Sequence, residues 1–329
     1  MPDNLKNKSI LITGGAGFIG SNIADYLVEN NYSKIFILDN LETGSLKNIE
    51  AHTQNNKITF VNGDITNYET CLNATKSIDI VLHQAALGSV PRSIENPINT
   101  HNVNVTGFLN MLEASRQNKV KRFVYASSSS VYGDNADLPK EEDNVGNPLS
   151  PYAVSKKTNE LYARIYVELY NMEIIGLRYF NVFGPKQNPA GPYAAVIPIF
   201  INNILNNKAS SIFGDGTNRR DFTYVDNVVH ANTLAAFTEN KAALGHVYNV
   251  AFGSTKSVNS LFEQIKSELN NNVEPVYLPA RIGEIKDSFA SIEKAKKLLG
   301  YSPLVDLEKG IVKTINWYKN NISARDSNS

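Results

Sequence analysis

The sequence has little of what disulfide-bonded, secreted or membrane proteins require. Cys71 is the only cysteine among the 329 residues, so no disulfide can form within the chain. The first residues, MPDNLK, lack the apolar core of a signal peptide, and no apolar run is long enough to span a bilayer. We therefore expect a cytoplasmic protein without a membrane segment.

Neither the charge balance nor the pattern of histidine and cysteine indicates a charged partner or a bound metal. Lys plus Arg and Asp plus Glu number 32 each, so no overall field attracts nucleic acid or an anionic membrane. The five histidines show no metal-ligand spacing, and no histidine accompanies Cys71 in a nucleophile motif. We expect no metal, no nucleic-acid partner and no membrane partner, and any bound anion must be held by local basic side chains.

The most informative stretch is residues 10–22, ILITGGAGFIGSN. An apolar run leads into closely spaced glycines and then a helical pattern, which is typical of the first strand, turn and helix of a dinucleotide-binding fold. Gly15, Gly17 and Gly20 fit the glycine spacing of this fingerprint. With Gly14 there is a second pattern, in which glycine occupies every third position. The start of the helix would then face the pyrophosphate. The predicted cofactor contacts in this turn are Gly14, Gly17, Phe18, Ile19 and Gly20.

A second apolar run, residues 35–38, ends at Asp39 about 20 residues beyond the glycines, where the fingerprint places a ribose ligand. The carboxylate of Asp39 can accept hydrogen bonds from both adenosine ribose hydroxyls and would repel a 2′-phosphate. NAD is therefore favoured over NADP as the cofactor. The alternative interpretation is a structural glycine turn followed by a surface aspartate.

The remaining pattern predicts an α/β fold: a Rossmann-type doubly wound parallel sheet with a smaller, interleaved C-terminal α/β substrate domain. Further strands are predicted at 58–63, 78–83, 122–127, 173–178 and 246–250. Helices are predicted at 97–118, 152–171, 194–206, 225–239, 256–270 and 307–320. We expect residues 1–180 to form the NAD-binding domain with 225–250 returning to it, residues 181–224 and 251–322 to form the substrate domain, and residues 323–329 to form a disordered tail.

Residues that follow the strands are further candidates, because ligands bind at the carboxyl ends of parallel strands. Asp64 and Ile65 follow the third strand, where they could meet the adenine. The small residues after the fourth strand would let a cofactor pass close to the backbone. The predicted cofactor contacts after the strands are Asn40, Gly44, Asp64, Ile65, Gln84, Ala85 and Ala86.

Tyr152 is the only tyrosine with a lysine four positions later, Lys156, and that spacing puts both side chains on one helix face. An adjacent ammonium and the positive nicotinamide would favour the phenolate. A fall in the Tyr152 pKa from about 10 to about 7 needs roughly 4 kcal/mol. One of the four serines at 127–130 would hydrogen-bond the same substrate hydroxyl, with Ser128 preferred. The alternative is a surface helix beside a polar strand end.

These residues carry a resemblance to the extended short-chain dehydrogenase/reductases. Its motifs are TGGAGFIG at 13–20, the serine-rich strand end before VYG at 131–133, and Tyr152-x-x-x-Lys156. Within that family the chain is similar to the UDP-hexose 4-epimerases, especially those that act on UDP-N-acetylglucosamine. The segments that carry this closer similarity are 83–93, 177–184, 193–198, 214–222 and 281–284.

The resemblance implies roles for further residues. Asn181, Arg220 and Arg281 would hold the UDP diphosphate, and a guanidinium suits this because it can bind phosphate oxygens in a bidentate manner. Ala195 and Val196 would border the uracil pocket. Asn104 and Tyr179 would flank the nicotinamide.

Three departures from the family patterns bear on the chemistry. Related 4,6-dehydratases and decarboxylases carry acidic residues where this chain has Ser129 and Ser130, so we expect reversible oxidation without elimination. Glucose-type epimerases carry a bulky tyrosine where this chain has Ser288, and a serine leaves room for an N-acetyl group. A lysine of those enzymes aligns with Gly88, so Ser89 is a candidate contact there.

The resemblance therefore implies an NAD-dependent UDP-N-acetylglucosamine/UDP-N-acetylgalactosamine 4-epimerase. Tyr152 would remove the C4 hydroxyl proton while the C4 hydride passes to NAD⁺, and the sugar would turn over before the hydride returns to its other face. Alternatives are UDP-N-acetylhexosaminuronic acid or UDP-glucose/UDP-galactose as substrate, a net NAD-dependent UDP-sugar oxidoreductase, and a non-catalytic NAD-binding protein. The resemblance also implies a homodimer that pairs helices 97–118 and 152–171.

Replacing Tyr152 with Phe removes the hydroxyl that exchanges the proton and keeps the ring. We expect turnover of UDP-N-acetylglucosamine to fall by about 10²- to 10⁴-fold, the range for a lost general acid–base group. The measurement separates the C4 epimers, with folding followed by circular dichroism and bound NAD by absorbance. Near-normal turnover by a folded variant that retains NAD would contradict the assignment of Tyr152.

Overall fold

The computed structural model describes residues 7–32, 34–190, 194–280 and 287–326, with the side chains of 322–326 left out. Its centre is a seven-stranded sheet in the order β11-β6-β5-β4-β1-β2-β3, in which every neighbouring pair is parallel. The strands are β1 Ser9–Thr13, β2 Lys34–Asp39, β3 Ile58–Asn62, β4 Ile80–His83, β5 Arg122–Ser128, β6 Glu173–Tyr179 and β11 Val247–Val250. The chain winds outward in both directions from β1 and β4, so the predicted doubly wound Rossmann-type sheet is confirmed.

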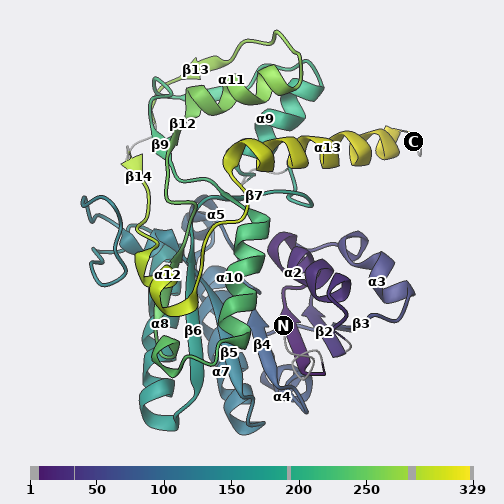
Figure 1. Cartoon of the computed structure of the whole chain (residues 1–329), viewed down its shortest axis with the longest axis vertical. Coiled ribbons are helices and arrows are strands. Elements are labelled where there is room, and N and C mark those ends of the chain that lie inside the picture. Colours follow the sequence, from purple (N-terminus) through teal and green to yellow (C-terminus); the bar gives the residue numbers. More distant parts are fainter. Residues whose placement is uncertain (1–6, 33, 191–193, 281–286, 327–329) are drawn as a thin grey trace.

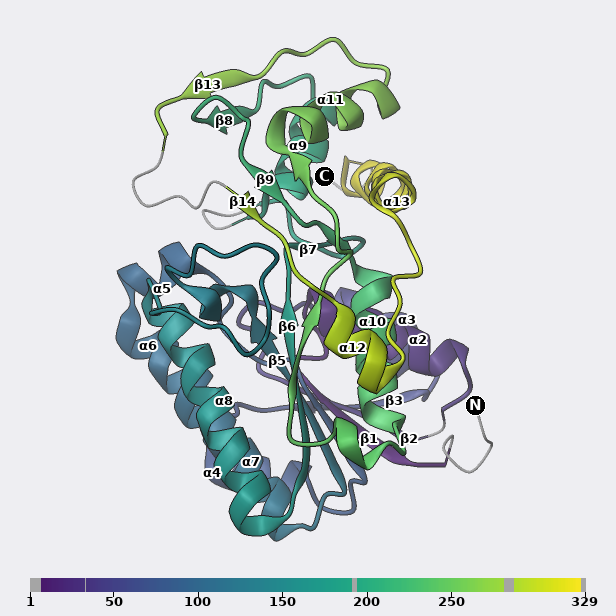
Figure 2. The same cartoon turned by 60° about the vertical axis from the view of Figure 1, so that its left-hand side comes forward.

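Helices cover both faces of this sheet (Figure 2). On β1, Ile10 and Ile12 point to one core and Leu11 points to the other, which explains why the strand is apolar at every position. One face carries α2 Phe18–Glu29, α10 Val225–Phe237 and α12 Glu293–Leu299. The opposite face carries α4 Tyr68–Ala74, α7 Gly107–Gln117 and α8 Pro151–Tyr170.

A second group of elements lies beyond one end of the sheet, at the top of Figures 1 and 2. Its helices are α9 Val196–Leu205, α11 Val258–Glu268 and α13 Leu307–Asp326, which share a separate apolar core around Phe200 and Phe262. Its strands form three small sheets: β7 Val182–Phe183 with β10 Thr223–Tyr224, β12 Lys256–Ser257 with β9 Arg219–Arg220 and β14 Asp287–Ser288, and β8 Ser211–Phe213 with β13 Val276–Leu278. The domain boundaries proposed from the sequence stay predictions.

Two predicted helix boundaries are wrong. The helix expected over 97–118 is divided into α6 Pro97–His101, a π-helical segment Asn102–Thr106 and α7. The wider turn contains Asn104, whose side chain bonds to the backbone of Leu87, a tertiary contact that no periodicity reveals. Helix α13 continues to Asp326 rather than ending at 320, and no Gly or Pro interrupts residues 321–326. The disordered tail stays a prediction. Residues 327–329 lie outside the described part.

The short elements that complete the chain lie mostly in connections. They are the helices α3 Glu50–Gln54 and α5 Val90–Glu95 and the single-turn helices Leu46–Asn48, Ser129–Tyr132 and Lys241–Ala243.

The packing of α2 against the glycine turn predicts the effect of one added methyl group. A Cβ on Gly20 would overlap the carbonyl oxygen of Gly14 and lie 2.7 Å from the Cα of Gly15. We expect Gly20→Ala to lower the free energy of unfolding by about 1–3 kcal/mol, since backbone atoms must move to admit the methyl. Urea unfolding measures this, with Gly88→Ala as control because nothing lies within 4 Å of its Cβ position. Equal stability of both variants would contradict the close packing.

Candidate functional site

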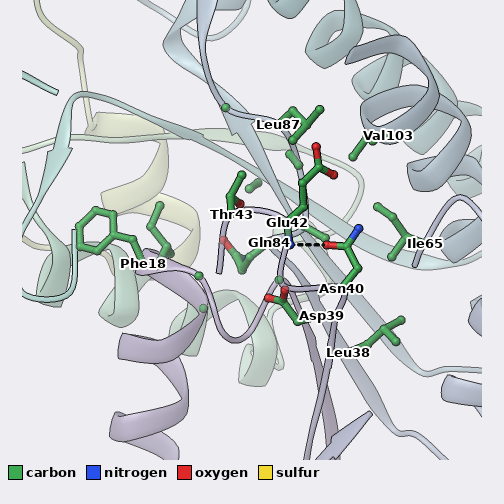
Figure 3. Close-up of a pocket in the computed structure, with 18 of the residues that line it drawn as sticks. Phe18, Leu38, Asp39, Asn40, Glu42, Thr43, Ile65, Gln84, Leu87 and Val103 are labelled. Carbon is green, nitrogen blue, oxygen red and sulfur yellow. Dashed lines mark hydrogen bonds between the residues drawn. The ribbon is translucent and has the colours of Figure 1, made fainter. Parts of the chain in front are cut away.

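A cavity of about 310 Å³ lies at the carboxyl ends of the central strands, between β1 and β4 where the winding direction reverses (Figure 3). In open parallel sheets this is where ligands bind. The cavity is lined by Gly14, Gly17, Phe18, Ile19, Gly20, Leu38, Asp39, Asn40, Glu42, Thr43, Gly63, Asp64, Ile65, Gln84, Ala85, Ala86, Leu87, Gly88, Val103, Ala126, Ser127, Tyr152, Lys156 and Tyr179.

The glycine turn has the geometry that a pyrophosphate needs. Gly14 has a φ of +66°, and a Cβ there would lie 2.7 Å from the amide nitrogen of Ala85, so only glycine fits. Helix α2 begins after Gly17 with no side-chain cap and no acidic residue in its first turn. Its first amides are therefore not engaged by a capping side chain and carry the positive end of the helix dipole toward the cavity. This wall fits a dinucleotide.

Asp39 is held firmly at the cavity wall. Its Oδ2 accepts a hydrogen bond from the amide of Ala16 at 3.0 Å, and its Oδ1 accepts one from the amide of Leu41 at 2.8 Å. The side chain of the next residue, Asn40, donates to Asp64 at 2.9 Å, which joins the loops after β2 and β3. A fixed carboxylate in this place fits an adenosine ribose and disfavours a 2′-phosphate.

The cavity contains every predicted cofactor contact except Gly44 and Asn104. Gly44 lies behind the glycine turn, where a Cβ would be 2.9 Å from the carbonyl carbon of Ala16. Asn104 is 1% exposed; its Oδ1 accepts from the amide of Leu87 at 2.7 Å and its Nδ2 donates to the Leu87 carbonyl at 3.1 Å. Asn104 therefore supports Leu87, which itself lines the cavity, and its nicotinamide contact stays a prediction.

Nine lining residues are absent from the predicted cofactor contacts, although one of them, Ser127, is among the four serines predicted to contact the substrate hydroxyl. Most of these residues follow a predicted strand or adjoin a predicted contact. Their position at the ends of the strands is the sequence signal that could have located them. Val103 is different, because it reaches the cavity from the π-helical segment. The nine are Leu38, Glu42, Thr43, Gly63, Leu87, Gly88, Val103, Ala126 and Ser127.

The predicted reacting residues meet at one end of this cavity. Tyr152 lies in the first turn of α8, which Ser150 caps by accepting from the amide of Ala153 at 3.1 Å. Lys156 is 3% exposed, and its Nζ donates to the carbonyl oxygen of Ala126 at 2.8 Å. The same Nζ lies 6.0 Å from the centre of the Tyr152 ring. Phenol and ammonium therefore share one wall, as their spacing predicted.

Two contacts distinguish the four serines. The hydroxyl of Ser128 lies beside the phenol of Tyr152 and acts to lower its pKa, whereas the hydroxyl of Ser127 donates to Glu160 at 2.6 Å. Ser129 and Ser130 lie in the single-turn helix after β5, where Ser130 accepts a hydrogen bond from Ser128 at 3.1 Å. Ser128 is therefore the serine that faces Tyr152.

Burial shifts the pKa values of both Tyr152 and Lys156. It raises the pKa of Tyr152 above its usual 10.0, and the neighbouring hydroxyl of Ser128 opposes that rise. Burial also lowers the pKa of Lys156 to about 8, while the negative charge of Glu160 acts in the other direction. In the chain by itself burial disfavours the phenolate more than its neighbours favour it. The predicted fall in the Tyr152 pKa to about 7 counts on the positive nicotinamide of bound NAD⁺ and stays a prediction.

Three predicted substrate residues come together in the second group of elements. Arg220 on β9 lies opposite Ser288 on β14 in a parallel pair. Asp221 links them to Asn181, because its amide donates to the Ser288 carbonyl at 3.0 Å and its carbonyl accepts from the Asn181 side chain at 2.8 Å. The Asp221 side chain is buried and accepts from the amides of Phe252 and Gly253, each at 2.9 Å.

The other predicted substrate residues are more scattered. Ala195 and Val196 lie at the start of α9, and Ser89 caps α5 by accepting from the amide of Arg92 at 3.2 Å. Arg281 lies outside the described residues. None of the described substrate candidates lines the cavity; they are Ser89, Ser128, Ser129, Asn181, Ala195, Val196, Arg220 and Ser288.

Neither a metal centre nor a membrane helix is found in the described part of the chain. No three His, Cys, Asp or Glu side chains within it are grouped to hold a metal ion. None of the described helices combines the length and apolar character needed to cross a bilayer.

Comparison with known proteins agrees with this geometry. Residues 10–251 match the NAD dependent epimerase/dehydratase family. A Methanocaldococcus jannaschii protein, provisionally named a UDP-glucose 4-epimerase, is 44% identical over 95% of this chain and 99% of its own length.

Two solved structures are similar throughout. The UDP-glucose 4-epimerase of Thermotoga maritima, solved with UDP-glucose, has a TM-score of 0.89 and 36% identity, covering 95% of this chain and 99% of that one. The UDP-N-acetylglucosamine 4-epimerase of Methanobrevibacter ruminantium M1, in complex with UDP-N-acetylmuramic acid, has a TM-score of 0.90 and 37% identity, covering 96% and 99%.

His83, at the end of β4, predicts a pH dependence of stability. Its ring is buried between Phe108 and Phe123, and burial followed by the charge of Lys156 lowers its pKa from 6.5 to about 3. Below pH 6.5 the unfolded chain protonates this histidine while the folded chain keeps it neutral. The free energy of unfolding therefore falls as the pH drops from 6.5 toward 3, by up to about 1.4 kcal/mol per pH unit.

We therefore expect His83→Asn to flatten the loss of unfolding free energy between pH 6.5 and pH 4, measured by urea unfolding at several pH values. His101→Asn, at an exposed position, controls for the loss of a histidine. An unchanged slope in His83→Asn would show that His83 titrates in the folded state.

Proposed function

This chain belongs to the NAD dependent epimerase/dehydratase family, and we propose that it is a UDP-hexose 4-epimerase that interconverts UDP-N-acetylglucosamine and UDP-N-acetylgalactosamine. The resemblance seen in the sequence is confirmed by the family match and by the similar 4-epimerases. The cofactor is NAD, as predicted.

One observation carries the proposal: a single cavity joins the glycine turn and Asp39 at one end to Tyr152 and Lys156 at the other. This arrangement supports a dinucleotide whose reactive end lies beside a phenol. Bound NAD⁺ supplies a hydride acceptor and, on the return step, the hydride donor. The protein's own side chains supply the remaining chemistry, which is proton transfer and positioning of the sugar.

Tyr152 takes the proton of the sugar's C4 hydroxyl as that carbon becomes a ketone, and returns a proton to the oxygen after the sugar has turned over. Ser128, which lies beside the phenol, orients the same oxygen. Lys156 stabilises the phenolate through its charge, while its hydrogen bond to the Ala126 carbonyl holds the ammonium in place. Substrate and product differ only at C4, so no proton is gained or lost over the cycle.

The serine turn supports an epimerase rather than a dehydratase. Elimination of water needs a carboxylate beside the oxidised sugar, and the positions where related dehydratases carry one are Ser129 and Ser130 here. A hydroxyl at either position cannot serve as a strong general acid or base near neutral pH. The 4-keto sugar is therefore expected to be reduced again rather than to lose water.

The substrate proposal rests on Ser288. Its small side chain lies opposite Arg220, the proposed diphosphate ligand, and a serine there leaves space that a tyrosine would fill. The similarity to the Methanobrevibacter UDP-N-acetylglucosamine 4-epimerase supports an acetamido sugar. UDP-glucose is the second candidate, favoured by the Thermotoga structure that contains it.

A homodimer remains part of the proposal. Helix α8 exposes Val154, Leu161, Ile165 and Leu169, which lie on one helical face. Ile94 on α5 and Ile98 on α6 are exposed as well. A contiguous apolar surface of this kind supports pairing of the α8 helices between two copies.

The proposal is tested by incubating the purified protein, with no cofactor added, with UDP-N-acetylglucosamine, UDP-glucose and UDP-N-acetylglucosaminuronic acid. Separation of the C4 epimers should show the highest kcat/KM for UDP-N-acetylglucosamine. Formation of free NADH with a released ketone would instead indicate a net oxidoreductase, and preference for either of the other sugars would overturn the substrate assignment.

The volume at position 288 predicts substrate selectivity. Ser288→Tyr should reduce kcat/KM for UDP-N-acetylglucosamine about 10²-fold more than that for UDP-glucose, because added bulk excludes the acetamido group by sterics. Ser288→Ala, which keeps the space, is the matched control and should retain the wild-type preference. Equal loss on both substrates in Ser288→Tyr would remove the steric reason for an acetamido sugar.

A further inference from the structure

A buried carboxylate lies one helical turn beyond Lys156. Tyr152, Lys156 and Glu160 are spaced four residues apart on α8, so they form one row along the helix. Glu160 is 7% exposed and does not line the cofactor cavity. Its location beside the reacting pair, but outside the cavity, distinguishes it from a residue that touches substrate.

Each member of this row meets one of three successive residues at the end of β5. The ammonium of Lys156 donates to the Ala126 carbonyl at 2.8 Å. The next residue, Ser127, donates its hydroxyl to Oε1 of Glu160 at 2.6 Å. Ser128 then lies beside the phenol of Tyr152. Two consecutive residues at the end of the strand are therefore hydrogen-bonded to α8, and the third faces it.

Glu160 is itself fixed from the neighbouring strand. Arg178 on β6 lies opposite Ser127 in the sheet register and is 3% exposed. Its Nε donates to Oε1 of Glu160 at 2.8 Å and its Nη2 donates to Oε2 at 2.9 Å. Its Nη1 donates to the Glu142 carbonyl at 2.8 Å, and its guanidinium lies 4.9 Å from the centre of the Tyr132 ring. Little freedom remains for the carboxylate.

The contacts of Glu160 fit neither a group that reacts with the substrate nor an ion pair that mainly stabilises the fold. Both oxygens of Glu160 accept hydrogen bonds from Ser127 or Arg178, so the carboxylate is poorly placed to exchange a proton with a substrate. A buried ion pair is also weak support for a fold, because its desolvation offsets most of the attraction. The short bond to Ser127 indicates a role in placing the end of β5.

We propose that Glu160 is a positioning residue for the epimerisation, which holds Ser127 so that the end of β5 presents Ser128 to Tyr152. This inference rests on the proposed function, because Ser128 and Tyr152 act on the sugar only if that function is correct. A displacement of Ser128 by 1 Å would then weaken catalysis without loss of substrate binding.

The charge of Glu160 has a second effect, on Lys156. Burial lowers the Lys156 pKa to about 8, and the carboxylate opposes that change. Lys156 also interacts with Tyr152 on α8 and His83 on β4, and Tyr179 on β6 lines the same cavity. The charged partners of Glu160 itself are Arg178 on β6 and Lys157 on α8. Glu160 carries the only negative charge among these groups. Removing that charge favours loss of a proton from the Tyr152–Lys156 pair.

Ser127→Ala tests the positioning role because it removes one hydrogen bond and leaves the Glu160–Arg178 pair intact. We expect kcat for UDP-N-acetylglucosamine to fall roughly tenfold while KM stays within about twofold of the wild-type value. Ser127→Thr restores the hydroxyl and should recover most of the lost kcat, which a purely volumetric effect would not do.

Glu160→Gln tests the charge. In addition to a lower kcat, we expect the rising limb of the kcat–pH profile to move to lower pH, since the pair loses its proton more readily. Glu168→Gln is the matched control, because Glu168 lies on the same helix in an exposed ion pair with Arg164. Circular dichroism establishes folding; if Glu160→Gln does not fold, the Ser127 variants decide the question.

The outcomes separate the two proposals. A wild-type enzyme that epimerises, together with Ser127→Ala at wild-type kcat, would overturn the positioning role alone. An unmoved pH profile in folded Glu160→Gln would overturn the effect of its charge on Lys156. A wild-type protein that epimerises no UDP-hexose would overturn the proposed function and the role of Glu160 together.

Discussion

The hydrogen bond from Lys156 to the carbonyl oxygen of Ala126 is the contact on which the site depends. It joins α8 to the end of β5 at the point where the cofactor cavity and the reacting side chains meet. A buried ammonium needs such an acceptor, because burial of an unpaired charge is costly. This hydrogen bond fixes the rotation of α8 about its axis, and it therefore also fixes the direction of Tyr152 one turn earlier.

Charge in this site is balanced locally rather than by the protein as a whole. Lysine and arginine match aspartate and glutamate in number over the chain, so no long-range field assists the chemistry. Around Lys156, burial keeps His83 neutral and Glu160 supplies the opposing charge. A cation shielded from water between these groups interacts strongly with a phenolate, and this is the condition that the proposed role of Tyr152 as a base requires.

The sequence predicted those parts of the fold and site that depend on short-range pattern. Apolar runs marked the parallel strands, and the spacing of Tyr152 and Lys156 marked a shared helix face. What it did not predict depends on contacts across the fold. The π-helical segment follows from the bonds between Asn104 and Leu87, and the raised pKa of Tyr152 follows from burial by distant elements. The link from Glu160 to Arg178 depends on the register of β6.

The most direct measurement is a crystal structure of the protein with NAD and UDP-N-acetylglucosamine. The account predicts that the Tyr152 phenol oxygen and the Ser128 hydroxyl both lie within about 3.2 Å of the sugar's C4 oxygen, with the nicotinamide against the C4 carbon. A dinucleotide bound elsewhere, or a C4 oxygen far from Tyr152 while another side chain contacts it, would contradict the account.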